Sequence, residues 1–232
     1  MNNIAFILAR SKSKRIKNKN IIKINGKHLI GWLILKLKRS NFFKDIIVST
    51  DSIKIKKISE RYGARVPFLR SKLNASDHAT TNSALLETIA KYNKINRAKY
   101  KYACCFYASN PFFEMNKNIA GLKKIKKNKY HSVFSSLKIN NKYVRSFTLN
   151  KQNKISLLNK NFLNSRTQDL PKTYLDAGQW YWIDTDSYIK EKKIITNNSS
   201  TIIIDDKKSI DLDTLLDLKK LKKIFNENYG KK

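Results

Sequence analysis

IAFILARSKSKRIKNKN, residues 4–20, is the stretch of sequence that decides the fold of this chain. Its first five residues form an unbroken apolar run, and the remainder is polar and strongly basic. A short apolar run of this kind is typical of a strand that is buried on both faces of a parallel sheet. Because ligands collect at the carboxyl ends of such strands, the basic segment predicts a ligand-binding loop.

The alternation of short apolar runs with longer segments of helical spacing continues along the chain. Further strand-like runs lie at 45–50, 65–68, 102–108, 132–137, 180–183 and 201–205. Apolar residues at helical spacing lie at 28–40, 55–62, 81–92, 116–127 and 215–225. This alternation predicts an α/β fold in which a mostly parallel sheet is flanked by helices.

Between about 140 and 175 the pattern loosens into polar, charged sequence with little periodicity. Such a stretch inside an α/β domain is either an excursion that pairs with another subunit or a lid over a site. We find neither an internal repeat nor a Pro/Gly/Ser-rich linker, so we expect residues 1–232 to form a single domain.

The chain is strongly basic, with 49 Lys and Arg against 17 Asp and Glu and a formal net charge of +32. This charge makes a nucleic-acid-binding protein the rival class of function. Only nine of the basic residues are Arg, which is the side chain suited to bidentate contacts, and the Lys residues are spread along every element. We therefore expect a solvated lysine coat and no specific nucleic-acid partner.

No apolar run approaches the roughly 20 residues that a membrane-spanning helix needs. The opening apolar run also lacks the features of a secretory signal. We therefore expect a cytoplasmic protein without a membrane partner. Cys104 and Cys105 are adjacent in a strand-like run, which would direct them to opposite faces of the sheet as structural thiols.

The loop after the first strand gathers cations with hydroxyl and amide groups. Its candidate binding residues are Arg10, Ser13, Lys14, Lys19 and Asn20. Positive charge and hydrogen-bond donors at the end of a parallel strand suit a triphosphate. The alternative is an exposed basic loop in a chain that is basic throughout.

A second candidate segment, SDHATTNS at 76–83, opens a predicted helix. Thr80 and Thr81 either cap that helix or hydrogen-bond a nucleoside, and capping is the commoner role of such residues.

Two further candidate segments are YASNPFF at 107–113, which leaves the predicted central strand, and SIDLDT at 209–214. In an extended segment, Asp211 and Asp213 lie on the same side and can share a divalent cation. Mg²⁺ prefers carboxylates together with phosphate oxygens. The alternative is that Asp213 or Thr214 caps the final helix.

These segments have a shared order and spacing that resembles a known family. AFILARSKSKRIKNKN at 5–20 is similar to the opening motif of the acylneuraminate cytidylyltransferases, and the similarity continues through 46–52, 62–70 and 209–214. It therefore spans almost the whole chain. SRTQDLPKTYLDAGQWYW at 165–182 resembles the sugar-side motif of the pseudaminic acid cytidylyltransferase branch.

The resemblance implies an enzyme that transfers CMP from CTP to pseudaminic acid, a nine-carbon acidic sugar, releasing pyrophosphate. The product would serve surface glycan or flagellin glycosylation. It also implies a Rossmann-like fold of the nucleotide-diphospho-sugar transferase type, and a homodimer in which 140–175 reaches the neighbouring subunit. Transfer to N-acetylneuraminate or a related sugar is the alternative activity.

One departure from the family motif concerns the first loop. Ser11 and Lys12 stand where the family has two glycines, which allow a close backbone approach to phosphate or a positive φ. An inactive homologue is therefore a further alternative.

The resemblance also implies roles for individual residues. Those implied for the nucleotide are Arg10, Ser13, Lys14, Lys19, Asn20, Thr80 and Thr81. Those implied for the sugar are Arg166, Gln168, Asp169, Asp176 and Gln179. Asp211 and Asp213 would hold Mg²⁺, and the residues expected to act in catalysis are Arg10, Lys14 and Asp211.

Overall fold

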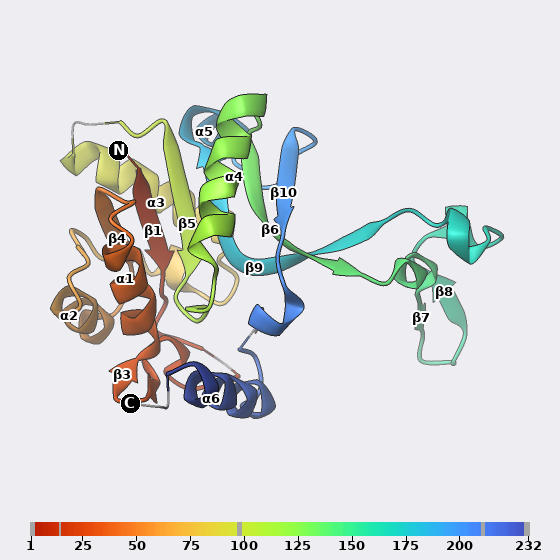
Figure 1. Ribbon diagram of the computed structural model, residues 1–232, viewed down its shortest axis with the longest axis horizontal. Helices are drawn as coiled ribbons and strands as arrows, with labels where there is room; N and C mark the ends of the chain where they lie inside the picture. The colour runs from red at the N-terminus through yellow and green to blue at the C-terminus, as the bar shows by residue number, and fades with distance from the viewer. Residues whose placement is uncertain (1–2, 14, 97–98, 210–211, 230–232) are drawn as a thin grey trace.

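The computed structural model describes residues 3–13, 15–96, 99–209 and 212–229. Its centre is a six-stranded sheet in the order β10-β6-β9-β5-β1-β4 (Figure 1). The strands are β1 Ile4–Leu8, β4 Asp45–Ser49, β5 Tyr102–Tyr107, β6 Ser132–Ile139, β9 Thr173–Asp184 and β10 Ser199–Ile203. Only β9 runs antiparallel to its neighbours, which confirms the predicted mostly parallel sheet.

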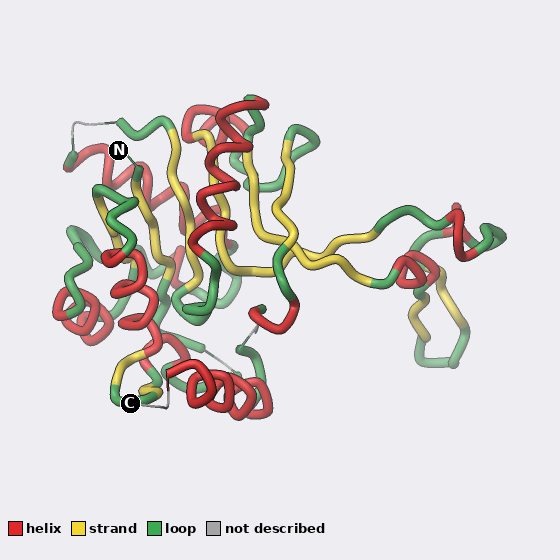
Figure 2. Tube along the Cα trace, in the orientation of Figure 1, coloured by secondary structure: helices red, strands yellow, loops and turns green. Residues whose placement is uncertain are grey.

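Helices cover both faces of this sheet, as Figure 2 shows. The helices are α1 Leu29–Arg39, α2 Ile53–Arg61, α3 Thr81–Ile95, α4 Met115–Asn128, α5 Thr185–Glu191 and α6 Leu215–Tyr229. The first hydrophobic core joins α1, α2 and α4 to one face, and the second joins α3 and α5 to the other. Cys104 belongs to the first core and Cys105 to the second, so the prediction that they point to opposite faces is confirmed.

The strand predicted at 65–68 is wrong. Only one isolated parallel bridge forms there, between Ile47 and Arg65. The backbone of Arg65 donates to Ile46 and accepts from Val48, but Pro67 has no N–H with which to extend the ladder.

Strand β9 is much longer than the apolar run at 180–183 suggested, and it is bent. Gly178 has a φ of +62°, a conformation that favours glycine, and its N–H donates to the carboxylate of Asp176 at 2.9 Å. The pairing of β9 with β6 shifts register opposite this point, between Phe134 and Ser136. The half of β9 before the bend pairs with β6 alone and leaves the body of the molecule.

Residues 140–175 lie in an arm that projects from the end of β6 and returns into β9 (Figure 1). A two-stranded antiparallel sheet forms its far part. The arm contains η3 Asn141–Arg145, β7 Phe147–Leu149, β8 Ile155–Leu157, η4 Lys160–Phe162 and η5 Thr167–Asp169.

The last helix, α6, packs against the region that follows β1. Leu221 and Phe225 of α6 are fully buried in a third core that also contains Ile16 and Leu29. Short elements carry the chain through this region: η1 Lys19–Ile21, β2 Lys23–Ile24 and β3 Lys27–His28. The last helix is thereby held against the segment that follows the first strand. Within the described part of the chain, no helix is both long and apolar enough to cross a membrane.

Candidate active site

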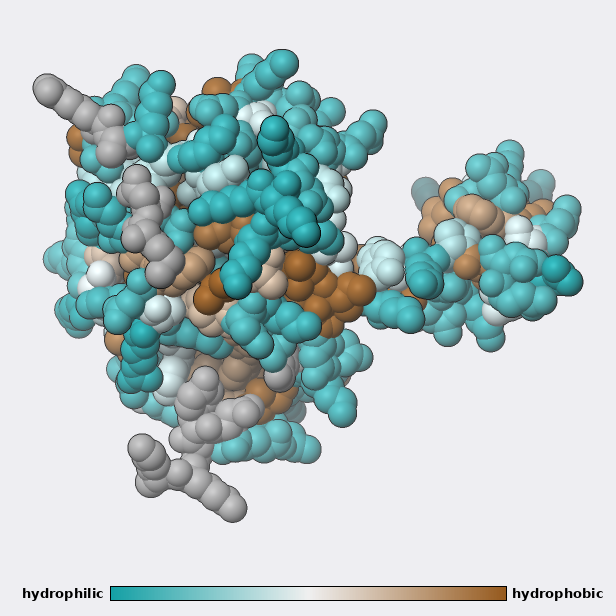
Figure 3. Space-filling view, turned by 45° about the horizontal axis from the view of Figure 1, so that its top comes forward, coloured by the Kyte–Doolittle hydropathy of each residue, from teal (hydrophilic) through white to brown (hydrophobic). Residues whose placement is uncertain are grey.

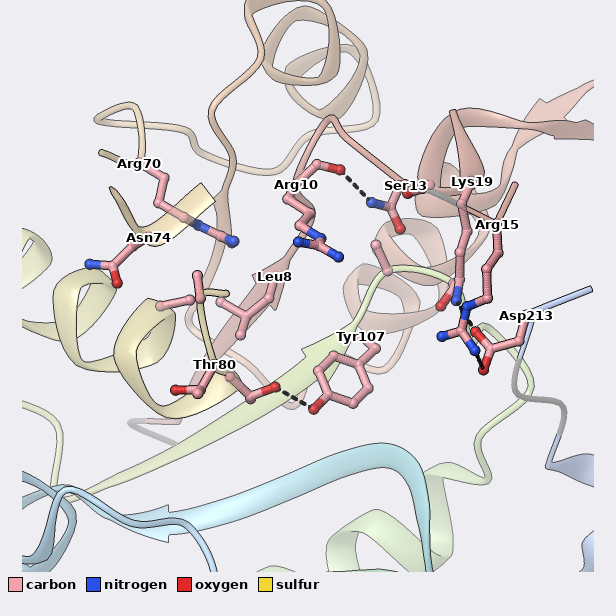
Figure 4. Close-up of a pocket in the computed structure, with 16 residues that line it drawn as sticks. Leu8, Arg10, Ser13, Arg15, Lys19, Arg70, Asn74, Thr80, Tyr107 and Asp213 are labelled. Atoms are coloured by element: carbon pink, nitrogen blue, oxygen red, sulfur yellow. Dashed lines mark hydrogen bonds and ion pairs between the residues drawn. The ribbon is translucent and has the colours of Figure 1, made fainter. Parts of the chain in front are cut away.

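A cavity of about 360 Å³ opens at the carboxyl ends of β1 and β5 (Figure 4). The loop after β1, the start of α3 and the segment before α6 all contribute to its walls. Its polar lining residues are Arg10, Ser13, Arg15, Lys19, Asn20, Arg70, Asn74, Thr80, Thr81, Tyr107, Ser109 and Asp213. The structure thus brings four separate stretches of the sequence to one place.

The first loop presents Arg10 to the cavity from the end of β1. The Arg10 guanidinium donates to the backbone oxygen of Ser76 at 2.9 Å and lies 3.3 Å from the carboxylate of Asp77. The buried amide of Asn20 donates to the backbone oxygen of Arg10 at 2.9 Å. Asn20 therefore fixes the position of the loop as well as lining the cavity.

Asp213 meets two cations of the first loop inside the cavity, as Figure 4 shows. Its carboxylate lies 2.7 Å from the guanidinium of Arg15 and 3.2 Å from the ammonium of Lys19. Thr214 is the cap of α6, because its hydroxyl accepts from the backbone N–H of Asp217 at 3.2 Å, and the Asp217 carboxylate accepts in return from the backbone N–H of Thr214 at 2.7 Å. Of the two caps that the sequence offered, the structure thus uses Thr214 and not Asp213. The Asp213 carboxylate is consequently available to the cavity.

Thr80 and Thr81 open α3 beside the cavity, and each hydroxyl already has a role. Thr80 is the N-cap, since its side-chain oxygen accepts from the backbone of Ser83 at 3.1 Å. The Thr81 hydroxyl lies 2.6 Å from the hydroxyl of Tyr107, which comes from the end of β5. Burial raises the pKa of Tyr107, so this phenol stays protonated and remains a hydrogen-bonding group.

Arg70 is a cavity residue that the sequence reasoning missed. Its side chain is only 7% exposed and is held by Ser49 at the end of β4. Its Nε donates to the Ser49 hydroxyl at 3.0 Å, and its Nη2 donates to the Ser49 backbone oxygen at 2.6 Å. Burial lowers the pKa of Arg70, but an arginine starts so far above neutrality that the guanidinium stays charged.

Asn74 reaches the cavity from the short 3₁₀ segment η2, Leu73–Ala75. Its amide donates to Glu87 of α3 at 2.6 Å, and the same carboxylate accepts from the backbone and hydroxyl of Ser71, each at 2.7 Å. Burial alone would raise the pKa of Glu87, but hydrogen bonds from Lys91, Ser71 and Asn74 outweigh it and lower that pKa to about 2. Glu87 is therefore a charged anchor for this wall.

The residues predicted for the sugar do not line this cavity within one chain. Arg166 and Asp169 form an exposed ion pair at 2.9 Å on the arm, and Gln168 beside them is also exposed. Gln179 is buried at the bend of β9. Asp176, next to that bend, accepts from the hydroxyl of Tyr181 at 2.8 Å.

Tyr181 connects the bend of β9 to the cavity wall, because its ring lies 5.6 Å from the ring of Tyr107. Burial raises the pKa of Tyr181 as well, so both phenols stay protonated, and the Tyr181 hydroxyl donates to the Asp176 carboxylate. Asp176 is therefore the predicted sugar residue with a short structural connection to the cavity.

Two predicted catalytic residues, Lys14 and Asp211, lie outside the described residues. Among the residues that the structure does describe, no three His, Cys, Asp or Glu side chains lie close enough to hold a metal ion by themselves. Ser11 and Lys12 are described, and neither has a positive φ. The loop therefore follows a path that does not require the positive φ that glycine allows.

The charges around the cavity favour an anion. Arg10, Arg15, Lys19 and Arg70 line it together with one described carboxylate, that of Asp213. Convergent cations in a partly enclosed site bind phosphate groups and stabilise the negative charge that develops during phosphoryl transfer. Such an arrangement at the edge of an α/β sheet is typical of a nucleotide-binding site.

Comparisons with known proteins agree with this arrangement. Residues 4–231 match the family model described as "Cytidylyltransferase", and the chain belongs to that family. It is 33% identical to a pseudaminic acid cytidylyltransferase of Campylobacter jejuni subsp. jejuni, over 99% of this chain and 98% of that protein. It is also 33% identical to a Helicobacter pylori protein that combines a pseudaminic acid cytidylyltransferase with a hydrolase, over 86% of this chain and 38% of that protein.

A solved structure with a similar fold is a CMP:2-keto-3-deoxy-manno-octonic acid synthetase complexed with CTP. Its TM-score is 0.72 at 12% identity, with 98% of this chain and all of that chain covered. The predicted Rossmann-like fold and the predicted nucleotidyltransferase family are thus confirmed. The rival prediction of a nucleic-acid-binding protein is not supported.

Proposed function

We propose that this chain transfers CMP from CTP to pseudaminic acid, giving CMP-pseudaminic acid and pyrophosphate for surface glycan or flagellin glycosylation. The observation that carries the proposal is the full-length similarity to a pseudaminic acid cytidylyltransferase. The cavity supports the nucleotide half, because a triphosphate needs several cations from more than one direction. Arg10, Arg15, Lys19 and Arg70 meet that need.

The reaction requires one bond to form and one to break. The oxygen of the sugar's anomeric hydroxyl bonds to the α-phosphorus of CTP and loses its proton, while the bond from that phosphorus to the β-phosphate oxygen breaks. Pyrophosphate leaves with the electron pair of the broken bond, so its leaving oxygen gains negative charge. Arg10 and Lys19 face the cavity from the first loop, where they stabilise that charge.

Mg²⁺ belongs to the proposal as a cofactor, and Asp213 fits it as a ligand. Mg²⁺ is usually bound through one or two carboxylates together with substrate phosphates and water, so a complete protein cage is not expected. Asp213 presents a carboxylate within the same cavity as the phosphate-binding cations. The ion, when bound, would supply a further positive charge to the phosphates.

We also propose a homodimer formed through the arm. The far part of the arm is a two-stranded sheet, which is marginal in water without further cover. Figure 3 shows apolar groups at its surface among hydrophilic ones. The apolar side chains there that are exposed by more than half are Tyr143, Phe147, Leu149, Ile155, Leu158 and Leu163. A concentration of exposed apolar side chains on one element is typical of an interface.

A second copy would also explain where the sugar-side residues act. Arg166, Gln168 and Asp169 are exposed on the arm and do not line the cavity of their own chain. In a dimer whose arms cross, these residues of one subunit would complete the site of the other. We place this reaction in the cytoplasm, where CTP is available.

Release of pyrophosphate tests the proposed function. Wild-type protein with CTP, Mg²⁺ and pseudaminic acid should release pyrophosphate at a rate well above that with N-acetylneuraminic acid. Lys19→Ala should lose most of this activity, whereas Lys17→Ala, an exposed lysine of the same loop, should retain it.

Two results would contradict the proposal in different ways. Preferred turnover of N-acetylneuraminic acid would assign the chain to the sialic acid branch. Absence of turnover with either sugar, in protein that still binds CTP, would indicate an inactive homologue.

A further inference from the structure

We propose that Asp51 is a positioning residue, which fixes the nucleotide-binding loop through both polar groups of Ser11. The inference rests on the proposed CTP binding and concerns how this chain holds its loop without the two glycines of the family motif. Asp51 lies just after β4 and does not line the cavity, so it acts through the loop and not on the nucleotide.

The contact between Asp51 and Ser11 uses both oxygens of one carboxylate. The backbone N–H of Ser11 donates to Oδ1 of Asp51 at 2.7 Å, and the hydroxyl of Ser11 donates to Oδ2. Both residues are partly buried. Hydrogen bonds to an ionised carboxylate are about twice as strong as neutral ones, and two such bonds fix direction as well as distance.

A glycine at position 11 would retain the backbone half of this contact and lose the hydroxyl half. Ser11 and Lys12 have negative φ angles, so the loop gains nothing from the left-handed conformations that glycine provides. The hydroxyl therefore adds a contact that the family motif lacks, and it does so without backbone strain.

The contact matters because Arg10 directly precedes Ser11. The backbone of Arg10 is held by the amide of Asn20 on one side and by the contact of Ser11 with Asp51 on the other. Arg10 points into the cavity, as Figure 4 shows. Loss of Asp51 would remove one of these two constraints. The Arg10 guanidinium would then no longer be held in a single direction.

The segment that ends β4 also positions the second cavity arginine. Ser49 accepts two hydrogen bonds from the Arg70 side chain, and the backbone oxygen of Thr50 accepts from the backbone of Arg70 at 2.8 Å. The relative positions of Arg70 and Arg10 are therefore fixed by three consecutive residues, Ser49, Thr50 and Asp51. The binding of a triphosphate that contacts both arginines depends on their relative positions.

Charge alone predicts the opposite effect of removing Asp51. Burial lowers the pKa of Arg70, and the negative charge of Asp51 partly offsets that lowering, which shows that this carboxylate lies near the cavity cations and opposes the binding of an anion electrostatically. If Asp51 acted only as a nearby negative charge, Asp51→Ala would tighten CTP binding. If it positions the loop, Asp51→Ala weakens CTP binding. The sign of the change therefore separates the two roles.

The test measures Kd by calorimetry for CTP and for cytidine, which lacks phosphates. We expect Asp51→Ala to weaken CTP binding about tenfold or more, and Ser11→Ala to weaken it several-fold, from the loss of charged hydrogen bonds. Asp51→Asn should restore most of the affinity, because an amide can accept from the Ser11 N–H and donate to its hydroxyl. Cytidine affinity should stay within about twofold of wild type, since one phosphate-loop contact is altered.

Glu60→Ala is the matched control, because Glu60 lies in the last turn of the neighbouring helix α2 and its carboxylate pairs with Lys56 at 3.8 Å. It removes the same charge without touching the loop and should leave CTP affinity unchanged. A double variant of Ser11→Ala with Asp51→Ala should bind CTP as weakly as Asp51→Ala alone. Should Asp51→Ala fail to fold, Ser11→Ala still tests the pair, since it removes only a hydroxyl.

Several results would overturn the inference. Unchanged or tighter CTP binding by Asp51→Ala would do so, as would an equal loss of CTP and cytidine affinity, which would indicate a general structural role. Equal weakening by Asp51→Asn and Asp51→Ala would contradict the hydrogen-bonding argument. Wild-type protein that bound no CTP at all would overturn the proposed function first and this inference with it.

Discussion

Arg70 shows how burial and hydrogen bonding prepare a single side chain for binding. Its stem is enclosed, and Ser49 accepts from two of its nitrogens, which leaves the remaining donors directed toward the cavity. Lysine has the same charge but cannot make two divergent contacts with Ser49 and still present donors to a ligand.

Arg70→Lys should therefore weaken CTP binding about tenfold or more, although the charge of the cavity is unchanged. Arg65→Lys is the control, since Arg65 is exposed and pairs with Asp45 at the opposite end of β4. Calorimetric Kd values for CTP check this prediction. Similar affinities of the two variants would show that Arg70 contributes charge alone.

Glu87 makes the cavity wall sensitive to acid. Its folded pKa of about 2 lies below its ordinary value of 4.5, so its stabilising contribution is complete above pH 4.5 and is lost as pH falls through about 2. The difference in unfolding free energy between wild type and Glu87→Gln should accordingly shrink as pH falls from 5 to 3. Urea unfolding at several pH values measures it, and a difference independent of pH would contradict the assignment.

Individual site residues were predictable where a motif marked them. Arg10, Ser13, Lys19 and Asn20 follow a strand in one loop, and the cavity contains all four. No role was predicted for Arg70, or for Tyr107 within its candidate segment, because these side chains act through contacts with Ser49 and Thr81, which are distant in sequence. The catalytic and binding roles of these residues remain predictions.

At the scale of elements, helix α6 is what brings the end of the chain to the first loop. Phe225 is 1% exposed and packs against Phe112 and Trp32, with ring centroids 4.5 and 5.1 Å away. The same helix begins just after Asp213, so its docking sets where that carboxylate lies. The stability of α6 is therefore coupled to the site.

Phe225→Ala should lower the unfolding free energy by about 3–5 kcal/mol, as loss of a buried phenylalanine usually does, and it should also weaken CTP binding. Leu216→Ala, on the same helix but 61% exposed, should change neither quantity appreciably. Denaturant unfolding and CTP titration of both variants provide the measurement. Normal CTP affinity in a destabilised Phe225→Ala protein would show that the packing of α6 does not affect the site.

The structure of the arm was the least predictable from the sequence pattern. Leu149 and Ile155 face each other across β7 and β8 and are both exposed by more than half. In a single chain these apolar side chains have no core to enter, which is why the region lacks the periodicity of the body. The strand predicted at 65–68 failed for a different reason, the missing N–H of Pro67.

A protein with Leu149→Asp and Ile155→Asp should be monomeric, because burying two carboxylates in an apolar interface is strongly unfavourable. Wild type should be dimeric, and so should the control Ile189→Asp, an exposed position on α5. Sedimentation analysis gives the masses. A monomeric wild type, or a dimeric arm variant, would contradict the proposed interface.

At the scale of the whole molecule, the order of strands and helices was largely readable from the sequence. Buried strands on two helix-covered faces give nearly continuous apolar runs, and the sheet contains all of them except 65–68. The antiparallel direction of β9 was not readable, since an apolar run does not reveal its direction. The extent of the single domain, 1–232, stays a prediction.

The net charge of +32 is a property of the whole surface and not of the site. Lysines cover elements on every side, whereas the cavity concentrates three arginines and one lysine around a carboxylate. Nonspecific attraction to polyanions should follow the surface and weaken steeply with salt. The family match and the cavity point instead to a small nucleotide substrate.

Crystallographic analysis of the protein with CTP and Mg²⁺ tests the central claim most directly. The account predicts a triphosphate within hydrogen-bonding distance of Arg10 and Lys19, with the Asp213 carboxylate beside it. A nucleotide bound elsewhere, with Asp213 still paired to Arg15 and remote from any phosphate, would contradict it.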